Sequence, residues 1–424
     1  MIRFLIKGLI RDRSRSLFPI ITVLIGAMLT VILYSWINGA ISNVIESSAN
    51  FTAGHVKVMS RAYGEEADRI PNDLAYIGVR KLILELSRDY PDLIWAPRIR
   101  FRGLLDIPDS AGETRAQGPI VGIAVDLRNE SSPEKDLLNL ESALVRGNLP
   151  MASGEILLSD MLAKEMGIEP GQLATLISVT MYGSMVIHNF KVSGTLNFGV
   201  TAMDRGSLLA DIADIQEALD MDDASGEILG FFRDFLYLDK EADKIETSFN
   251  KGYENVSDEF APRMTSLRHQ GGLSQTLDFA NLVYTIVIVL FVTVMSVVLW
   301  NAGLMGSLRR YHEFGIRLAL GEDKTHLYRS LIAESLIIGF VGSILGTILG
   351  LAVSYYMQKR GLNIGPMMKN ASMIISDTLR ARITPVSFFI GFIPGLFATF
   401  TGKAISGIGI YKRQTSQLTK EFES

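Results

Sequence analysis

The sequence predicts a membrane protein with four transmembrane α-helices and one large extracytoplasmic domain of mixed helices and strands (α+β). Apolar residues are concentrated in four blocks, and the mean hydropathy of the 424-residue chain is +0.25 although 20% of its residues are charged. The charged residues gather between the blocks, above all in residues 41–276. A soluble domain spreads its apolar residues more evenly, so this segregation indicates a membrane protein with a substantial water-exposed part.

Each apolar block is long enough to cross the roughly 30 Å hydrocarbon core of a bilayer, which takes about 20 apolar residues in a helix. The predicted spans are residues 17–40, 277–304, 331–357 and 385–408. The fourth is the weakest, because Pro394 and Gly395 interrupt it. The first could instead be the core of a cleaved signal peptide. Its apolar run is longer than a signal core, however, and a retained membrane anchor is favoured.

Basic residues orient these spans. Residues 1–16, the loop 305–330 and the tail 409–424 each place basic side chains next to a span, and short basic segments tend to stay in the cytoplasm. Both termini are therefore expected in the cytoplasm. Residues 41–276 and the shorter loop 358–384 are expected on the outer side of a bacterial inner membrane. The shorter loop also holds several basic residues, which runs against the rule.

Three glycines of the third span, Gly342, Gly346 and Gly350, recur every four residues and therefore share one helix face. Glycine at this spacing lets another helix backbone approach closely. The pattern fits a packing seam with another helix or another subunit. General enrichment of glycine in membrane helices is the simpler alternative, but three glycines in register favour the seam.

Two charged residues lie inside the predicted membrane region. Glu334 stands near the cytoplasmic end of the third span, where a carboxylate is a functional candidate. We expect it to reach the interface or to pair with a neighbouring arginine. Lys403, near the end of the fourth span, is expected to extend its amine to the interface. No series of acidic or histidine residues crosses the spans, so a proton relay is not supported.

The loop between the second and third spans reads RRYHEFGIRLALG over residues 309–321. Its spacing predicts a short helix that Gly321 terminates. A short charged helix at this place suits docking on a cytoplasmic partner. The residues expected to make that contact are Arg309, Arg310, Glu313, Arg317 and Gly321.

The segment EFGIRLALG, followed by Glu334 and the three glycines, resembles the FtsX-like permease family of ABC transporters. The order of one span, a large outer domain and three further spans is similar as well. The resemblance implies that residues 309–321 contain a coupling helix, which sits in a groove of a cytoplasmic ATPase. It also implies two kinds of partner: an ABC ATPase dimer, and a second permease that is either a homologue or another copy of this chain.

The chain has no GxxxxGK[ST] phosphate loop. Because the backbone of such a loop cradles nucleotide phosphates, ATP and Mg²⁺ are expected on the separate ATPase, and no cofactor is expected in this chain. The related exporter MacB carries a fused ATPase domain and differs in this respect.

Residues 41–276 alternate strand and helix patterns, which predicts an α+β domain. An amphipathic helix is expected over Asn72–Arg88, and helices that open on a capping residue are expected at Ser159 and Asp211. The resemblance implies a MacB-like periplasmic core with a strand-rich insert, here at about residues 118–226. The domain holds 36 acidic and 22 basic residues, which makes nucleic acid an unsuitable partner.

Two stretches of the outer domain look most like the lipoprotein-releasing permeases LolC and LolE: GEILLSDMLAKEMGIEPGQLATLISV and FKVSGTLNFGVTAMDRGSLLADIADIQEAL. One permease of that pair carries a proline-bearing hairpin that binds a periplasmic chaperone. The matching hairpin here is Met181, Tyr182, Gly183 and Ser184, and it lacks proline. These residues are candidates for contact with a chaperone or substrate. Otherwise this chain corresponds to the permease of that pair that lacks the chaperone-binding hairpin.

No catalytic arrangement is evident in the sequence. His55 and His188 have no triad partner or metal ligand at a recognisable spacing, and both are expected to be ordinary core or surface residues. Asp220, Asp222 and Asp223 lack the remaining ligands of a calcium loop and predict a solvated turn. The chain has no cysteine, which excludes disulfides and thiolate metal sites. We therefore assign no catalytic, cofactor-binding or metal-binding residue.

The resemblance implies a permease that extracts a lipid-anchored substrate, above all a lipoprotein, from the outer leaflet for transfer to a periplasmic chaperone. A transmembrane signal transmitter that activates a periplasmic cell-wall hydrolase, as FtsX-type proteins do, is a second hypothesis. Export of an amphiphile or peptide, as in MacB, is a third. A membrane-anchored enzyme is the least supported reading, because the sequence offers no catalytic arrangement.

Overall fold

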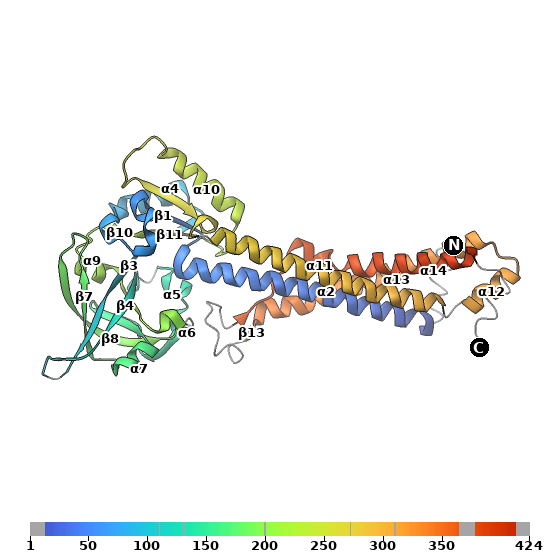
Figure 1. The fold of residues 1–424 in the computed structure, drawn as a ribbon, viewed down its shortest axis with the longest axis horizontal. Coiled ribbons are helices and arrows are strands. Elements are labelled where there is room, and N and C mark those ends of the chain that lie inside the picture. The colour runs from blue at the N-terminus through green and yellow to red at the C-terminus, as the bar shows by residue number, and fades with distance from the viewer. Residues whose placement is uncertain are drawn as a thin grey trace. The chain divides into compact units, whose positions relative to one another are not determined.

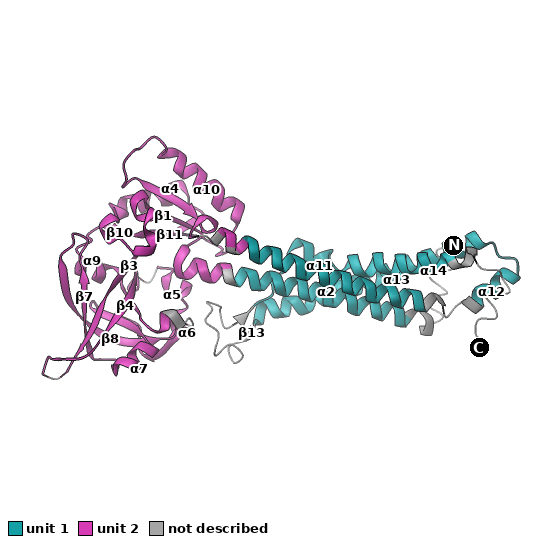
Figure 2. Cartoon of the chain, viewed as in Figure 1, with its two compact units in different colours: residues 1–43, 278–366, 377–424 teal, residues 44–277, 367–376 magenta. Residues whose placement is uncertain are grey.

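The computed structural model describes residues 13–109, 111–129, 132–198, 201–271, 273–308, 311–363 and 378–412. The chain divides into two compact units (Figure 2). The first, here called the helical unit, comprises residues 1–43, 278–366 and 377–424. The second, the sheet unit, comprises residues 44–277 and 367–376.

Long helices dominate the helical unit (Figure 1). Its helices are α2 (Arg13–Ser48), α11 (Leu273–Leu308), α12 (Tyr311–Ala319), α13 (Lys324–Arg360) and α14 (Thr399–Lys412). Four described segments are long and apolar enough to cross a membrane: Leu17–Ala53, Leu277–Met305, Lys324–Arg360 and Pro385–Ile408. Together with a separate domain that contains both helices and strands, they confirm the predicted fold class.

The observed helices extend beyond the predicted spans, because polar turns continue the apolar cores. Helix α2 runs to Ser48 and passes into a π-helical turn at Ala49–Ala53, whereas the predicted span ends at residue 40. Helix α13 begins at Lys324 rather than at residue 331. Asp323 fixes this start, since its carboxylate accepts hydrogen bonds from the backbone amides of Thr325 and His326.

The fourth predicted span is not one regular helix. A 3₁₀ turn covers Pro385–Phe388, a π-helical turn covers Ile393–Ala398, and α14 begins only at Thr399. Pro394 within the π-helical turn has no amide hydrogen to donate. The Thr399 hydroxyl donates a hydrogen bond to the carbonyl of Gly395 at 2.7 Å, which satisfies one of the backbone groups near this break.

Some predicted segments lie outside the described residues. These are residues 1–12, the tail 413–424 and most of the outer loop 358–384, of which residues 364–377 are not described. The ends of that loop meet in a two-stranded ladder, where β13 (Leu362–Asn363) pairs antiparallel with β14 (Thr378–Leu379).

The sheet unit is built on a mixed sheet in the order β12-β1-β11-β3-β4-β9-β6-β8-β5, with β7 paired to both β3 and β8. Two pairs, β4 with β9 and β6 with β8, are parallel. The strands are β1 (Val56–Ser60), β3 (Leu93–Pro108), β4 (Thr114–Val125), β5 (Leu144–Gly147), β6 (Glu155–Ser159), β7 (Leu173–Val179), β8 (Met185–Leu196), β9 (Ser207–Asp211), β11 (Glu227–Phe232) and β12 (Pro262–Ser266). A separate short ladder joins β2 (Tyr76–Ile77) to β10 (Ala224–Ser225).

Helices cover this sheet and enclose two large apolar clusters. The helices are α3 (Arg61–Glu65), α4 (Val79–Asp89), α5 (Glu134–Leu137), α6 (Leu140–Ala143), α7 (Asp160–Met166), α8 (Thr201–Asp204), α9 (Ile212–Ala218) and α10 (Asp239–Gly252). One cluster packs α4 and α10 on β1, β11 and β12, with Leu86 and Phe249 buried. The other packs α7 and α9 on β3, β4 and β6 to β9, with Phe101 and Ile215 buried. Burial of each such side chain contributes about 1.5–3 kcal/mol.

Strand β3 pairs with different neighbours along its length. Its residues Leu93–Arg98 pair with β11, and its residues Ile99–Pro108 pair with β4. At the changeover, the buried guanidinium of Arg98 donates to both carboxylate oxygens of Glu134 in α5, at 2.8 and 2.6 Å. Residue 118, near which the strand-rich insert is predicted to begin, falls inside β4, and residue 226 lies directly before β11.

The helix predicted over Asn72–Arg88 is shorter than expected. A 3₁₀ turn covers Asn72–Leu74, β2 follows, and α4 begins only at Val79. Gly78 takes a φ of +88°, a left-handed conformation that glycine tolerates and that separates β2 from the helix. The helices predicted to open at Ser159 and Asp211 are confirmed, because both side chains accept a capping hydrogen bond from the first turn of α7 and α9.

Candidate functional site

Helix α12 lies between α11 and α13 in the chain and is held against the start of α13. Phe314 is buried and packs with Leu327 and Leu331 of α13, and the partly buried Leu318 lies beside them. Phe314 and Leu318 are four residues apart, so both belong to the same face of α12. This contact makes α12 and the first turns of α13 one packed body.

The end of α12 is fixed by local hydrogen bonds. Gly321 takes a φ of +93°, and the amides of Gly321 and Glu322 donate to the carbonyls of Leu318 and Arg317. The Arg317 guanidinium donates to both carboxylate oxygens of Glu322, at 2.7 and 3.0 Å. Partial burial alone would raise the pKa of Glu322, but the hydrogen bonds with His326 and Arg317 outweigh it and lower that pKa. Arg317 thus stabilises the turn and is not simply directed at a partner.

The structure places the predicted contact residues of this helix unequally. Arg309 and Arg310 lie outside the described residues, and Glu313 is half-buried. The exposed face instead carries the apolar Ile316, and the apolar Leu320, directly after the helix, is 83% exposed. Sequence reasoning missed them because it followed the charges. Exposed apolar residues one turn apart on a charged helix are the signal that could have found them.

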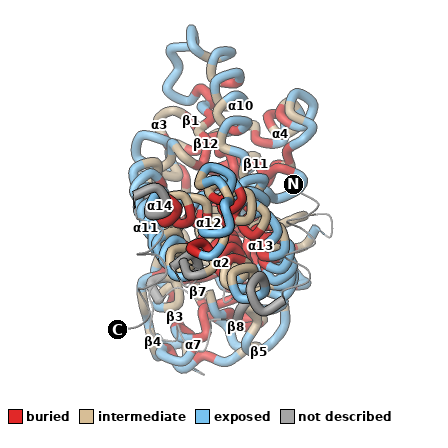
Figure 3. The backbone as a smooth tube through the Cα atoms, turned by 90° about the vertical axis from the view of Figure 1, so that its right-hand side faces the viewer, coloured by how far each residue is buried: buried red, intermediate tan, exposed pale blue. Residues whose placement is uncertain are grey.

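The three glycines of α13 lie against α2 of the same chain, where buried positions of both helices are red in Figure 3. A Cβ atom at Gly346 would stand 2.4 Å from the carbonyl oxygen of Leu24. Cβ atoms at Gly342 and Gly350 would stand 2.7 Å and 2.9 Å from the Cβ atoms of Val23 and Val31, respectively. This glycine face is therefore occupied by a helix within the chain.

Glu334 of α13 and Lys403 of α14 form an ion pair. The Lys403 Nζ lies 3.2 Å from Glu334 Oε1, and their side chains are only 8% and 14% exposed. Among the described contacts, Glu334 pairs with Lys403, a partner that the sequence analysis did not name, and the prediction that Lys403 extends its amine to the interface is wrong. Each charge finds its counter-ion inside the helical unit, since leaving either unpaired in an apolar interior is costly.

The hairpin of β7 and β8 carries the predicted contact residues of the sheet unit. Gly183 has a φ of +85°, and the amide of Thr180 donates to the carbonyl of Ser184 across the turn. Met181 is buried and its amide donates to the carbonyl of Leu219, so its side chain is not available to a partner. Tyr182, by contrast, is 71% exposed.

An exposed apolar patch, which the sequence analysis missed, continues from Tyr182 along the hairpin. Val179 and Met185 stand directly opposite each other in the ladder, and Ile177 pairs with Ile187 in the same way. Val179, Met185 and Ile187 are exposed. We call Val179, Tyr182, Met185 and Ile187 the hairpin patch. Strand alternation predicts that these positions share a face, but it does not show that this face stays uncovered.

The two histidines considered in the sequence have structural surroundings. His55 is buried, and its Nδ1 accepts a hydrogen bond from the Phe232 amide at 3.0 Å. Burial lowers the pKa of His55 to about 4, so the ring is neutral at ordinary pH. His188 packs on the ring of Phe190. Asp223, from the acidic turn, accepts a hydrogen bond from the Arg80 amide at the start of α4.

The C-terminal part of the chain is similar to known proteins. Residues 285–415 match the FtsX-like permease C-terminal family model. This region includes α12, the glycines of α13 and the Glu334–Lys403 pair. An uncharacterised ABC transporter permease of Methanocaldococcus jannaschii is 26% identical over 171 residues, which are 40% of this chain and 42% of that protein. The aligned region thus spans less than half of the length of that relative.

The FtsX-like region does not include the sheet unit. A similar solved structure is the periplasmic region of MacB from Actinobacillus actinomycetemcomitans, which is 13% identical to this chain. The alignment covers 54% of this chain and 93% of that one, with a TM-score of 0.36. At these values the likeness does not establish a common fold.

Proposed function

We propose that this chain is the permease subunit of an ABC transporter of the FtsX/MacB type, with α12 docking on a separate cytoplasmic ATPase. The observation that carries the proposal is the presence, within the FtsX-like region, of a short helix that is packed on α13 and exposes Ile316 and Leu320. A small apolar patch on an otherwise charged loop suits a groove in a partner protein.

The proposed mechanism passes force through contacts within the helical unit. Closure of an ATPase dimer on ATP and Mg²⁺ would push on α12. The contact of Phe314 with Leu327 and Leu331 would transmit that push to α13, and the close glycine contacts would transmit it to α2. Helix α2 continues in the chain toward β1, and α11 follows β12, so both connect directly to the sheet unit. Movement of these helices would then reach the outer domain without an aqueous pore.

We further propose that the transported substrate is a lipoprotein taken from the outer leaflet of a bacterial inner membrane and handed to a periplasmic chaperone. A second permease would complete the complex, and both termini would be cytoplasmic. The hairpin patch supports this part of the proposal, because exposed apolar side chains on neighbouring strands suit an apolar surface of a protein partner.

The docking step is tested by Leu320→Asp in the full chain, co-purified with its ATPase. Loss of one buried leucine contact removes about 1.5–3 kcal/mol, and we expect the affinity for the ATPase to fall at least about 10-fold. Met151→Asp, at an 88% exposed position of the sheet unit, is the matched control and should bind normally. Equal ATPase binding by both variants would remove α12 as the docking element.

The substrate is tested by reconstituting the permease complex in liposomes with a triacylated lipoprotein and a periplasmic chaperone. ATP should release the lipoprotein to the chaperone. Tyr182→Ser with Met185→Ser should reduce that transfer, whereas Leu84→Ser, an exposed position on α4, should not. A complex that releases no lipoprotein but captures a periplasmic cell-wall hydrolase would favour signal transmission. ATP-driven efflux of a small amphiphile alone would favour export.

A further inference from the structure

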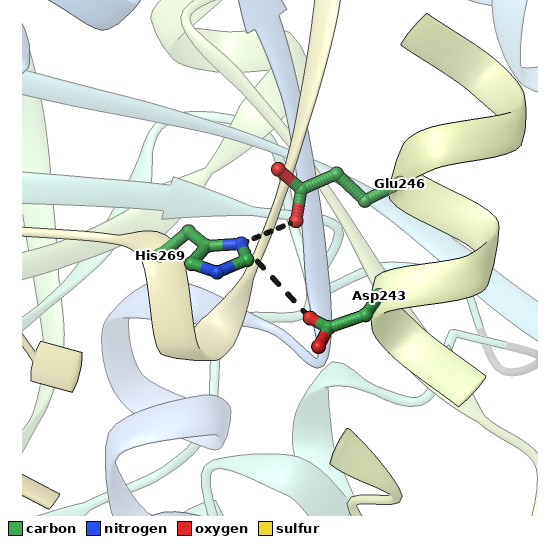
Figure 4. A group of neighbouring side chains, drawn as sticks. All are labelled: Asp243, Glu246 and His269. Atoms are coloured by element: carbon green, nitrogen blue, oxygen red, sulfur yellow. Dashed lines mark hydrogen bonds and ion pairs between the residues drawn. The ribbon is translucent and has the colours of Figure 1, made fainter. Parts of the chain in front are cut away.

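A histidine and two carboxylates of the sheet unit converge on one point (Figure 4). Asp243 and Glu246 are three residues apart on α10, so they share one helix face. His269 belongs to the 3₁₀ turn Leu267–His269 that follows β12. Its Nδ1 lies 2.8 Å from Glu246 Oε2 and 3.9 Å from Asp243 Oδ1.

We propose that Asp243, Glu246 and His269 bind a divalent transition-metal ion, for which Zn²⁺ is the best match. In a tetrahedral site with bonds of about 2.1 Å, neighbouring ligand atoms stand about 3.4 Å apart. The two distances from Nδ1 lie on either side of that value, and all three potential ligand atoms lie within 4.8 Å of one another. Shifts of about half an ångström would bring both distances from Nδ1 to that value.

The donor set selects among ions. One imidazole nitrogen and two carboxylate oxygens suit Zn²⁺ and its neighbours in the transition series, whereas Ca²⁺ and Mg²⁺ prefer oxygen ligands throughout. Two carboxylates also balance the charge of a divalent ion. Three protein ligands leave a fourth position open to water, and the half-exposed His269 side chain gives an ion a path from solvent.

The carboxylates are held in place by groups behind them. The Ser266 amide donates to Glu246 Oε2 at 2.9 Å, and the Ser266 hydroxyl donates to Asp243 Oδ1 at 3.0 Å. One helical turn further along α10, the Asn250 side chain both donates to and accepts from the backbone of Met264, at 2.8 and 2.9 Å. These bonds fix the same face of α10 to β12, so the ligands are oriented before any ion binds.

A bound ion would cross-link α10 to the segment that leads into α11. His269 stands four residues before α11 begins at Leu273. Without an ion, residues 267–271 are held by the His269 hydrogen bonds and the neighbouring turn. We therefore expect a bound ion to slow the local opening of these residues.

Calorimetric titration of Zn²⁺ into the full chain in detergent, purified with a tag free of histidine and stripped with a chelator, tests this site. We expect one Zn²⁺ per chain and no matching signal from Ca²⁺ or Mg²⁺. His269→Gln should weaken binding at least about 10-fold, since even loss of groups behind a ligand costs that much. Asp243→Asn should weaken it as well, and the control His188→Gln should not.

Hydrogen exchange gives a second readout on the same samples. Zn²⁺ should protect residues 267–271 in the wild type and not in His269→Gln, while peptides of β6 to β9 report that the variant is folded. Absence of stoichiometric Zn²⁺ binding, or equal affinity in the His269→Gln chain, would overturn the proposal. Neither outcome depends on transport activity, so the test separates this site from the proposed function.

Discussion

Removing one charge of the Glu334–Lys403 pair should destabilise the helical unit far more than removing both. Glu334→Gln removes the carboxylate that faces the Lys403 amine, and Lys403→Met removes the amine that faces the Glu334 carboxylate. The double variant leaves no buried charge at either site. Because the two side chains come from α13 and α14, the effect measures how these helices are held together.

The magnitude follows from the geometry. Opposite charges 3.2 Å apart attract by about 5 kcal/mol at an effective dielectric constant of about 20. Desolvation offsets part of this attraction, and breaking a buried pair typically costs about 3–5 kcal/mol. We therefore expect each single variant to lose about 3 kcal/mol in the free energy of unfolding. Replacing both partners is often close to neutral, so the double variant should lie within about 1 kcal/mol of the wild type.

Equilibrium unfolding of the detergent-solubilised chain by titration with SDS measures these differences in one double-mutant cycle. Lys359→Met, at an exposed lysine near the end of α13, controls for loss of a positive charge and should change little. The reasoning fails if each single variant costs less than about 1 kcal/mol and the two effects simply add, since the charges would then be independently solvated.

Three further outcomes are expected. Gly346→Ala should destabilise the helical unit by about 1–3 kcal/mol, because its Cβ would meet a backbone oxygen at 2.4 Å, whereas Gly303→Ala, with its nearest neighbour at 3.6 Å, should be tolerated in the same SDS titration. Burial holds the pKa of His55 at about 4, against 6.5 when exposed, so the unfolded state binds the proton first as pH falls. The free energy of unfolding of the sheet unit should therefore drop by up to about 3 kcal/mol between pH 6.5 and pH 4. Hydrogen exchange should show a flatter pH dependence of this free energy for His55→Asn, and an unchanged slope would refute the reasoning. Gly183→Ala should cost about 1–2 kcal/mol through its φ of +85°, seen as faster exchange in the hairpin, and equal exchange rates would show that the turn relaxes.

The fold class could be predicted because the responsible signals are local. Each apolar block specifies a helix through its own composition, and Ser159 and Asp211 mark helix starts through their own side chains. The boundaries were harder to place. At Asn72–Arg88 the apolar spacing continues through Ile77, but that residue pairs with Ala224 in a ladder that no local pattern reveals.

The pairing of the site residues depends on contacts between distant parts of the chain. Glu334 and Lys403 are 69 positions apart, and a sequence gives no sign that α14 brings its lysine to that carboxylate. Likewise, His269 lies 23 positions beyond Glu246, and only the packing of α10 on β12 joins them. The sequence predicts a short helix that Gly321 terminates, and α12 ends just before that glycine. It could not show that Arg317 would be bound by Glu322 while Leu320 faces outward.

The continuity of β3 limits how this domain can be divided or rebuilt. A fragment that keeps β1, β11 and β12 but discards residues 118–226 would leave the second half of β3 without most of β4 and without β7. Its exposed amides and carbonyls would then form a long free edge, which invites pairing with other chains and aggregation. Deletion or exchange of the region between β3 and β11 must therefore also shorten β3 to about Arg98, where the pairing partner changes.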